Sequence, residues 1–317
     1  MIVTVTLNPS LDRTVAVERL VRGEVLRTSS PVLQPGGKGV NVTRALSRNG
    51  AASVAVLPVG GAEGAELSAL LDVADVATRL VPVSGRTRSN LTISEPDGTI
   101  TKLNEPGSVL SASDLSALST VLTTLVKHGD WVVFSGSMPP ECGRDQLLSL
   151  LGPVRELGAS LAVDSSGDAL LTAIAAHPRL IKPNRSELAE AVGRPVLSIA
   201  DVVAAAQELR SRGVERVLVS LGSDGAVLVS ESGVIVGEST VLRQLSTVGA
   251  GDCFLAGFLS RFSADEADEG AALTEALAWG AAAVSLPGTT VPGPGDIAYS
   301  NVQLVWQPDL DRPLVAT

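Results

Sequence analysis

A glycine turn followed by an acidic residue is the first candidate site. Residues 246–258 read Ser-Thr-Val-Gly-Ala-Gly-Asp-Cys-Phe-Leu-Ala-Gly-Phe, which predicts a turn passing into an apolar helix. The first amides of a helix lack partners within it, so Gly249, Ala250 and Gly251 form a candidate anion hole. Asp252 is placed to accept the proton of an attacking hydroxyl, as phosphoryl transfer to an alcohol requires. An Asp that caps the helix is the alternative explanation.

A second glycine segment lies near the N-terminus. Residues 36–41, Gly-Gly-Lys-Gly-Val-Asn, place exposed backbone, the cation Lys38 and the amide Asn41 at the start of a predicted helix. The segment does not match the phosphate-binding loop G-x-x-x-x-G-K-[ST], because Gly39 follows Lys38 and Val32 stands at the first glycine position. No G-x-G-x-x-G opens this helix, which disfavours a dinucleotide fold. A tight turn with a solvated lysine explains the segment equally well.

A third segment offers oxygen ligands beside a lysine. Residues 182–187 read Lys-Pro-Asn-Arg-Ser-Glu and follow a short predicted strand. Asn184 and Glu187 are three residues apart, so on a helix they share a face and are placed to organise a hydrated Mg²⁺. An ordinary capping box has the same spacing and is the alternative.

Two further segments carry weaker signals. Ser220, Gly222 and Gly225 lie in a turn whose backbone amides are candidates for contact with nucleotide phosphates, and a plain hairpin connection is the alternative. Arg88 and Asn90 lie on a predicted hairpin and are suited to a substrate phosphate and hydroxyl. A solvated strand face explains that pair as well.

Strand-like and helix-like segments alternate along most of the chain. This order predicts an α/β fold of three layers, in which a mostly parallel sheet is covered on both faces by helices. Ligands of such sheets bind at the carboxyl ends of the strands. The predicted strands are 2–7, 52–58, 131–134, 161–163 and 217–220, and the predicted helices are 40–47, 65–71, 146–157, 169–176 and 202–212.

Two stretches interrupt the alternation. Residues 13–33 are strand-like without a helix, and residues 88–103 predict a hairpin with its turn at Pro96-Asp97-Gly98. We expect these stretches to pair as a small β lid over the main sheet, within a single domain spanning residues 1–317. Edge strands of the main sheet are the alternative.

Composition excludes several classes of protein. The chain has 317 residues, of which 45% are apolar and 18% charged, so it can bury a large core. Its 24 basic and 34 acidic residues give a formal charge of −10, which argues against nucleic-acid and anionic-membrane partners. Two cysteines and two histidines make a disulfide scaffold and zinc chemistry improbable. No secretory leader or membrane-length apolar run stands out, so we expect a cytoplasmic protein.

Taken together, the order of the motifs resembles that of the ribokinase-like carbohydrate kinases of the pfkB type. The likeness spans roughly residues 1–290, and its combination of motifs is highly specific. It is carried by residues 6–12, 35–42, 135–140, 164–167, 182–188, 220–222 and 247–252, and residues 85–90 resemble the branch of the family that acts on phosphosugars.

The resemblance implies a ribokinase-like fold and ATP-dependent phosphorylation of fructose 1-phosphate to fructose 1,6-bisphosphate, with Mg²⁺ as the metal. Asp252 matches the catalytic base and residues 249–251 match the anion hole. The other matches are Asp12, Gly37, Lys38, Asn41, Arg88 and Asn90 around the phosphosugar, Lys182, Asn184, Ser220, Gly222, Gly225 and Gly251 around the nucleotide, and Asn184 and Glu187 at the metal, reached through water.

Several alternatives stay open. Relatives that phosphorylate tagatose 6-phosphate or fructose 6-phosphate share the same motifs, although Lys38 favours the first of these two over the second. A sugar-phosphate sensor without activity is a rival from another class, and a nucleoside or unphosphorylated-sugar kinase is a third. The lid hairpins are a candidate homodimer contact, because they expose strand edges.

Overall fold

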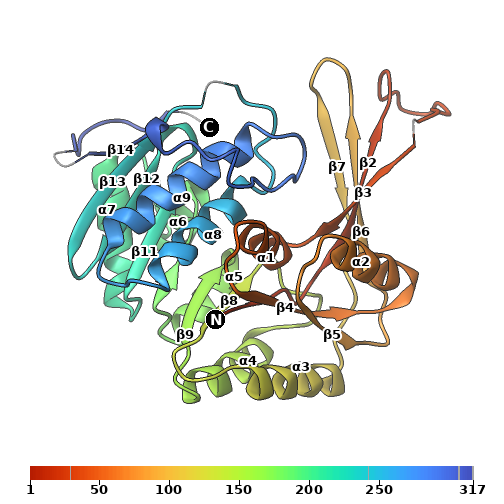
Figure 1. Ribbon diagram of the computed structural model, residues 1–317, viewed down its shortest axis with the longest axis horizontal. Coiled ribbons are helices and arrows are strands. Elements are labelled where there is room, and N and C mark those ends of the chain that lie inside the picture. Colours follow the sequence, from red (N-terminus) through yellow and green to blue (C-terminus); the bar gives the residue numbers. More distant parts are fainter. Residues whose placement is uncertain (29, 242, 306–307, 316–317) are drawn as a thin grey trace.

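The computed structural model describes residues 1–28, 30–241, 243–305 and 308–315. Within them a ten-stranded sheet has the order β14-β13-β12-β11-β10-β9-β8-β1-β4-β5 (Figure 1). The strands from β11 to β5 run parallel, whereas β12, β13 and β14 join antiparallel at one edge. The mostly parallel α/β sheet expected from the alternation is therefore confirmed.

The main-sheet strands are β1 (Ile2–Val5), β4 (Ser53–Val59), β5 (Thr78–Pro82), β8 (Trp131–Ser135), β9 (Ser160–Asp164), β10 (Leu180–Ile181), β11 (Arg216–Ser220), β12 (Ala226–Ser230), β13 (Gly233–Ser239) and β14 (Val302–Val305). The helices are α1 (Lys38–Arg48), α2 (Gly61–Val73), α3 (Ala112–Leu125), α4 (Arg144–Glu156), α5 (Gly167–Ile174), α6 (Arg185–Val192), α7 (Ile199–Ser211), α8 (Ala250–Phe262) and α9 (Glu269–Val284).

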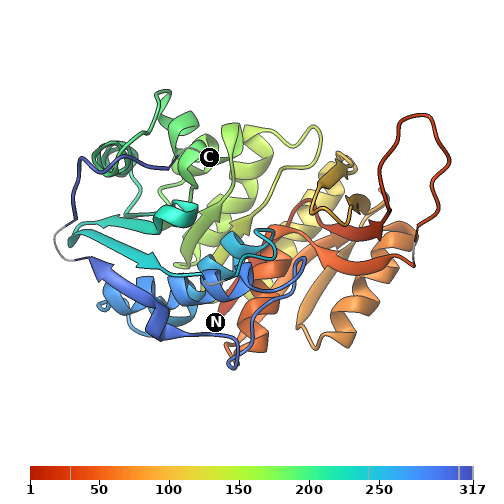
Figure 2. The ribbon, with the colours of Figure 1, turned by 90° about the horizontal axis from the view of Figure 1, so that it is seen from above.

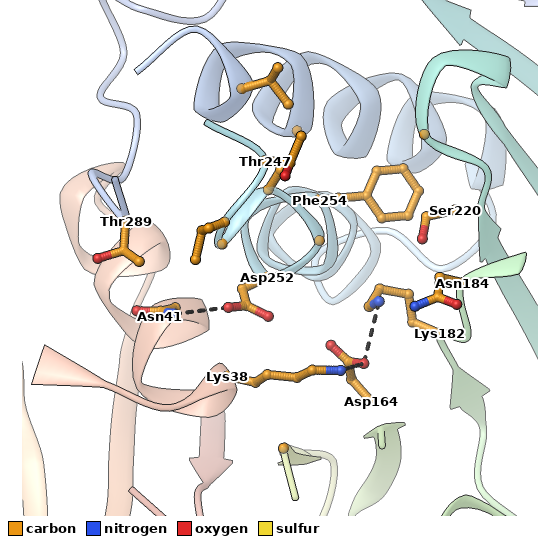
Figure 3. Close-up of a pocket in the computed structure, with 18 of the residues that line it drawn as sticks. Lys38, Asn41, Asp164, Lys182, Asn184, Ser220, Thr247, Asp252, Phe254 and Thr289 are labelled. Carbon is orange, nitrogen blue, oxygen red and sulfur yellow. Dashed lines mark hydrogen bonds and ion pairs between the residues drawn. The ribbon is translucent and has the colours of Figure 1, made fainter. Parts of the chain in front are cut away.

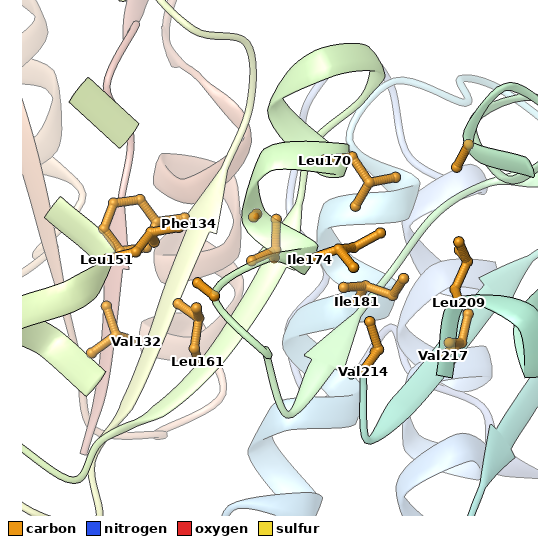
Figure 4. Close-up of a cluster of buried hydrophobic side chains, with 14 of the residues drawn as sticks. Val132, Phe134, Leu151, Leu161, Leu170, Ile174, Ile181, Leu209, Val214 and Val217 are labelled. Carbon is orange, nitrogen blue, oxygen red and sulfur yellow. The ribbon is translucent and has the colours of Figure 1, made fainter. Parts of the chain in front are cut away.

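Alternation along the central strands builds a core on each face of the sheet. In β8, Val132 and Phe134 pack with helices α3 to α7, and Trp131 and Val133 pack on the other face with α1, α8 and α9. Figure 4 shows the first of these cores, where Leu151 of α4 approaches Val132 and Phe134. Strands buried on both faces require helices on both, which gives the three layers expected from the sequence.

A second sheet of four strands stands beside the main one, in the order β3-β2-β6-β7 (Figures 1 and 2). Its strands are β2 (Ser10–Ala16), β3 (Val32–Gly36), β6 (Arg88–Ser94) and β7 (Ile100–Asn104). The two stretches predicted as a lid thus pair with each other, and their alternative placement as edges of the main sheet is wrong. The first stretch begins earlier than predicted, so that Asp12 lies within a lid strand.

The sequence patterns missed several elements. Helix α3 is rich in Ser and Thr, and α9 is rich in Ala, so neither shows a clear apolar stripe. Strands β5 and β14 are short and form the two edges of the sheet, and β13 lies next to β14. In the described part of the chain, no helix is both long and apolar enough to cross a membrane.

Candidate active site

One cavity of about 1050 Å³ lies between the lid and the carboxyl ends of the parallel strands. The lid reaches it through β2 and β6, and the main sheet through the segments that follow β1, β8, β10 and β11. All of the site residues expected from the sequence line this cavity. They are Asp12, Gly37, Lys38, Asn41, Arg88, Asn90, Lys182, Asn184, Glu187, Ser220, Gly222, Gly225, Gly249, Ala250, Gly251 and Asp252.

Asp252 lies in the first turn of α8, with its carboxylate in the cavity (Figure 3). The residue that caps α8 is Gly249, at φ 79°, so the alternative in which Asp252 caps the helix is wrong. Asn41 Nδ2 of α1 instead donates a hydrogen bond of 2.9 Å to Asp252 Oδ2. The carboxylate is therefore oriented by a neighbouring helix and stays available to a ligand.

The amides beside Asp252 have the character of an anion hole. Ala250 N donates to Thr247 O at 3.3 Å, whereas the amides of Gly249 and Gly251 make no hydrogen bond among the described residues. A methyl group added at Gly251 would lie 3.6 Å from Lys182 Nζ, so an ammonium group is close to the same turn. Free amides and a nearby cation attract negative charge.

The environment of Asp252 changes its acidity. Burial disfavours the carboxylate, and the negative charge of Asp164 adds to this effect, so the pKa of Asp252 rises to about 7. The hydrogen bond from Asn41 and the charges of Lys38 and Lys182 oppose the rise. A carboxylate with a pKa near neutrality can both accept and release a proton under physiological conditions.

Two lysines converge on one buried carboxylate at the centre of the site. Asp164 Oδ1 lies 3.0 Å from Lys38 Nζ and 3.3 Å from Lys182 Nζ (Figure 3). Glu187 Oε1 lies 3.5 Å from Lys38 Nζ. Burial disfavours the charge of Lys38, but these two carboxylates outweigh it and raise the pKa of Lys38 above its ordinary value. Lys38 is therefore a charged group held toward Asp164, which the sequence analysis did not anticipate.

Asn184 and Glu187 form the capping box that was the simpler alternative for their spacing. Asn184 Oδ1 accepts from Glu187 N at 2.9 Å, and Glu187 Oε2 accepts from Asn184 N at 2.8 Å, at the start of α6. Among the residues that the structure describes, no cluster of three or more His, Cys, Asp or Glu side chains could hold a metal by itself. Any divalent ion here would need oxygens from water or a ligand as well.

The turn between β11 and β12 is both a hairpin connection and part of the cavity wall. The two strands pair antiparallel, and residues 222–224 form a short 3₁₀ turn between them. Gly225 has φ 88°, and a Cβ there would lie 2.1 Å from Gly237 O, so only glycine fits. Gly222, Ser223 and Gly225 line the cavity, whereas Asp224 is not among its lining residues.

Polar side chains of the lid form the opposite end of the cavity. Asp12 Oδ1 accepts from Ser10 Oγ at 2.7 Å and from Asn90 Nδ2 at 3.0 Å. Arg88 donates to Glu105 O at 3.1 Å and to Ser137 Oγ at 3.5 Å, while its buried Nε has no hydrogen-bond partner among the described residues. In contrast to Lys38 and Lys182, Arg88 makes no ion pair within the described part of the chain.

Comparison with known proteins agrees with this geometry. The family model described as pfkB family carbohydrate kinase matches residues 5–294. The chain belongs to the pfkB family of carbohydrate kinases.

Individual members of this kinase family resemble the chain over most of its length. It is 39% identical over 264 residues to the 1-phosphofructokinase of Rhodobacter capsulatus, covering 81% of this chain and 82% of that protein. It is 35% identical over 287 residues to the ATP-dependent 6-phosphofructokinase isozyme 2 of Escherichia coli, covering 90% and 91%. The crystal structure of phosphofructokinase-2 from Escherichia coli in complex with potassium superposes with a TM-score of 0.89 at 34% identity, covering 93% and 96%.

The structure gives a place in the kinase site to two residues that the sequence analysis assigned no role, although Asp164 lies within the motif at residues 164–167. Asp164 is fully buried and joins the two lysines. Arg44 Nη1 donates to Asn41 Oδ1 at 3.1 Å and to the carbonyl of Thr289 at 3.3 Å, so it fixes the amide that in turn contacts Asp252. In the sequence, only the i, i+3 spacing of Asn41 and Arg44 on α1 could have suggested this contact. That spacing is too common on helices to identify a site residue.

One end of the cavity is apolar. It is lined by Val241, Phe254 of α8 and Leu277 and Val284 of α9, next to the turn at residues 222–225. Trp279 of α9 is buried in the core and does not line the cavity. The position of a residue along α9 decides whether its side chain reaches the site. Because α9 was not predicted, its lining residues could not be named from the sequence.

Proposed function

We propose that this kinase phosphorylates fructose 1-phosphate to fructose 1,6-bisphosphate with ATP as the phosphoryl donor. The observation that carries the proposal is the placement of Asp252 beside free amides in the same cavity as Arg88, which is a cation without a carboxylate partner among the described residues. Relatives named 1-phosphofructokinase, at up to 39% identity over most of the chain, support this choice of substrate.

The lid end of the cavity suits the phosphosugar. Arg88 supplies the charge for its phosphate, and Ser137 Oγ, 3.5 Å from Arg88 Nη2, offers a neutral donor beside it. Asp12, Asn41 and Asn90 provide acceptors and donors for the sugar hydroxyls. Because Lys38 is already paired with Asp164 and Glu187, we assign the sugar phosphate to Arg88 and place Lys38 beside the transferring phosphoryl group.

The other end suits the nucleotide. The apolar surface of Phe254, Leu277 and Val284 accommodates a base, and Gly222, Ser223 and Gly225 of the adjoining turn line the cavity where the phosphate chain would lie. Asp252 takes the proton of the sugar hydroxyl as that oxygen bonds to the γ-phosphorus and the bond to ADP breaks. The amides of Gly249 and Gly251, with Lys38 and Lys182, stabilise the negative charge on the transferring group.

The oxygens around Asp164 fit a magnesium ion bound with the nucleotide. Asp164 Oδ2 is buried without a hydrogen-bond partner among the described residues, and Glu187 lies within reach of the same lysine. Mg²⁺ keeps several waters and uses few protein oxygens, so Asp164, together with Asn184 and Glu187 through water, would hold it. When bound, the ion neutralises charge on the donor phosphates.

A rate comparison across phosphoketoses tests the proposed substrate. With ATP and Mg²⁺ in excess, we expect kcat/KM to be highest for fructose 1-phosphate, followed by tagatose 6-phosphate and then fructose 6-phosphate. With the phosphate held by Arg88, fructose 1-phosphate presents its free primary hydroxyl at C6, whereas both 6-phosphates present theirs at C1. The resemblance at Lys38 places tagatose 6-phosphate above fructose 6-phosphate. A higher kcat/KM for fructose 6-phosphate would instead assign the chain the activity of its 6-phosphofructokinase relative, and no ATP consumption with any of the three would favour a sensor.

We also propose that two copies pair through the lid. Val32 on β3 and Ile100 and Leu103 on β7 are exposed apolar side chains on the outer strands of the small sheet. Such strands invite pairing with another chain. Sedimentation velocity is expected to show a dimer that Leu103→Glu weakens, and a wild-type mass equal to one chain would contradict this proposal.

A further inference from the structure

The segment near the C-terminus contacts the turn that lines the nucleotide end of the cavity. Residues 308–315, here named the C-terminal strap, follow β14 and return across the main domain. Val315 N donates a hydrogen bond of 2.8 Å to Asp224 Oδ2, and Arg312 Nη2 donates one of 3.2 Å to the carbonyl oxygen of Asp224. The strap therefore binds both the side chain and the backbone of this one residue.

Asp224 belongs to the turn at residues 222–225 but differs from its neighbours. Gly222, Ser223 and Gly225 line the cavity, whereas Asp224 is 8% exposed and contacts the strap. Gly222 and Gly225 have positive φ angles of 62° and 88°, and glycine loses more conformational freedom on ordering than any other residue. Hydrogen bonds within the turn, such as Leu221 N to Gly225 O at 2.8 Å, hold part of it, and the contacts of Asp224 with the strap add a hold from outside the turn.

The strap is itself anchored on helices α6 and α7 and the segment between them. Leu314 packs into the core that contains α6 and α7, and its amide donates to Leu197 O at 2.8 Å. Ala200 N of α7 donates to Leu310 O at 2.7 Å. Arg185, the first residue of α6, donates through Nη1 to Val315 O at 2.7 Å. The contacts of Asp224 thus connect a glycine turn to the body of the protein.

A second contact ties the strap to the strand beside the turn. Arg312 Nη1 lies 2.9 Å from Glu238 Oε1 of β13, and the following residues Ser239, Thr240 and Val241 line the cavity. The guanidinium of Arg312 therefore joins β13 to the carbonyl of Asp224. The strap thereby contacts two of the segments that form the nucleotide end of the site.

We propose that the C-terminal strap is a positioning element for the nucleotide, which acts through Asp224 to hold the turn at residues 222–225 ready for the phosphates. This inference rests on the proposed function in placing the nucleotide at that end of the cavity. Preorganisation lowers the entropy lost on binding, so removal of the contact weakens nucleotide binding without touching the sugar end.

The test compares Asp224→Ala with the wild-type protein. We expect the KM for ATP and the Kd for ADP, measured by calorimetry without sugar, to rise by about five- to tenfold, as loss of one buried hydrogen bond implies. The KM for the sugar phosphate is expected to stay within about twofold, because the lid end keeps its contacts. Asp224→Asn retains an acceptor oxygen for Val315 N and is expected to restore ADP binding close to wild type.

Two further variants separate positioning from loss of stability. Ser230→Ala removes the 2.7 Å hydrogen bond from Ser230 Oγ to Glu269 at the other end of β12, and we expect it to leave ADP binding unchanged. Val315→Pro removes the amide hydrogen that Asp224 accepts, while also fixing φ at this exposed residue, and is expected to reproduce the Asp224→Ala defect. This second variant also serves if Asp224→Ala fails to fold.

The outcomes distinguish the inference from the proposed function. An unchanged Kd for ADP in folded Asp224→Ala or Val315→Pro would overturn the role of the strap. Equal increases in the ATP and sugar-phosphate KM values would do the same, because they indicate a general disturbance. If the wild-type protein phosphorylates no phosphoketose, the proposed function fails, while the ADP titrations still report on the strap.

Discussion

Asp252→Asn is expected to lower kcat for phosphorylation by roughly 10²- to 10⁴-fold, the usual contribution of a general base. Asn retains the size of the side chain and can still contact Asn41, but it cannot accept the proton of the attacking hydroxyl. The Kd for ADP should stay close to wild type, because the amides of Gly249 and Gly251 are unchanged. Steady-state kinetics combined with nucleotide titration measures both quantities.

The pH dependence gives this prediction a second readout. Since burial and Asp164 raise the pKa of Asp252 to about 7, kcat/KM of the wild-type enzyme should rise with pH up to this value and then level off. The base must be deprotonated, so below the pKa activity falls about tenfold per pH unit. Burial raises the pKa of Cys253 to about 12, so this thiol does not titrate near pH 7. Cys253→Ser should therefore leave the fall in kcat/KM below pH 7 unchanged.

A matched control separates catalysis from helix stability. Asp168 occupies the first turn of α5, as Asp252 does in α8, but it is not among the cavity residues. Asp168→Asn removes the same favourable charge at a helix start and should leave kcat within about twofold. Near-normal turnover of the Asp252→Asn variant would refute the assignment of the base.

Arg88→Gln is expected to raise the KM for the sugar phosphate by roughly 10- to 100-fold, as loss of a hydrogen bond to a charged group implies. Among the described residues Arg88 makes no ion pair, so its positive charge is available to the sugar phosphate. Replacing Arg88 by glutamine leaves that phosphate without its main counter-charge. The KM for ATP should hardly change, because Arg88 lies on the lid. Initial rates with each substrate varied in turn provide the measurement.

Arg13→Gln is the matched control for this substitution. Arg13 lies on β2, the lid strand that pairs with β6, but it does not line the cavity. The variant makes the same change in net charge on the same sheet and should keep both KM values. A sugar-phosphate KM that is unaltered in Arg88→Gln would place the phosphate elsewhere, with Lys38 as the next candidate.

Much of the fold could be predicted because it depends on local patterns. The Pro96-Asp97-Gly98 turn predicts the hairpin of β6 and β7, and the glycine turn before Asp252 predicts the start of α8. Helices α3 and α9 could not be found in this way. Their small and hydroxyl-bearing residues form helices here because they pack against the sheet and against α8, and packing partners are not visible in a local window.

The pairing of charges in the site was beyond reach of the motifs. Lys38 and Asp164 are 126 residues apart, yet their atoms lie 3.0 Å from each other. Asn184 and Glu187 had two explanations with the same spacing, and the capping hydrogen bonds appear only when the backbone is placed. A residue type shows which charge is available, but not which partner already holds it.

The sequence by itself determined which chemical groups the site contains and in which order along the chain, since glycine turns, strands and helix starts are set by neighbouring residues. It was enough to indicate a kinase of this family and to name Asp252 and Arg88. Only the tertiary structure decided that Asn41 orients Asp252, that Asp164 joins Lys38 to Lys182, and that the strap reaches Asp224. Such contacts join distant segments whose proximity depends on the packing of the whole domain.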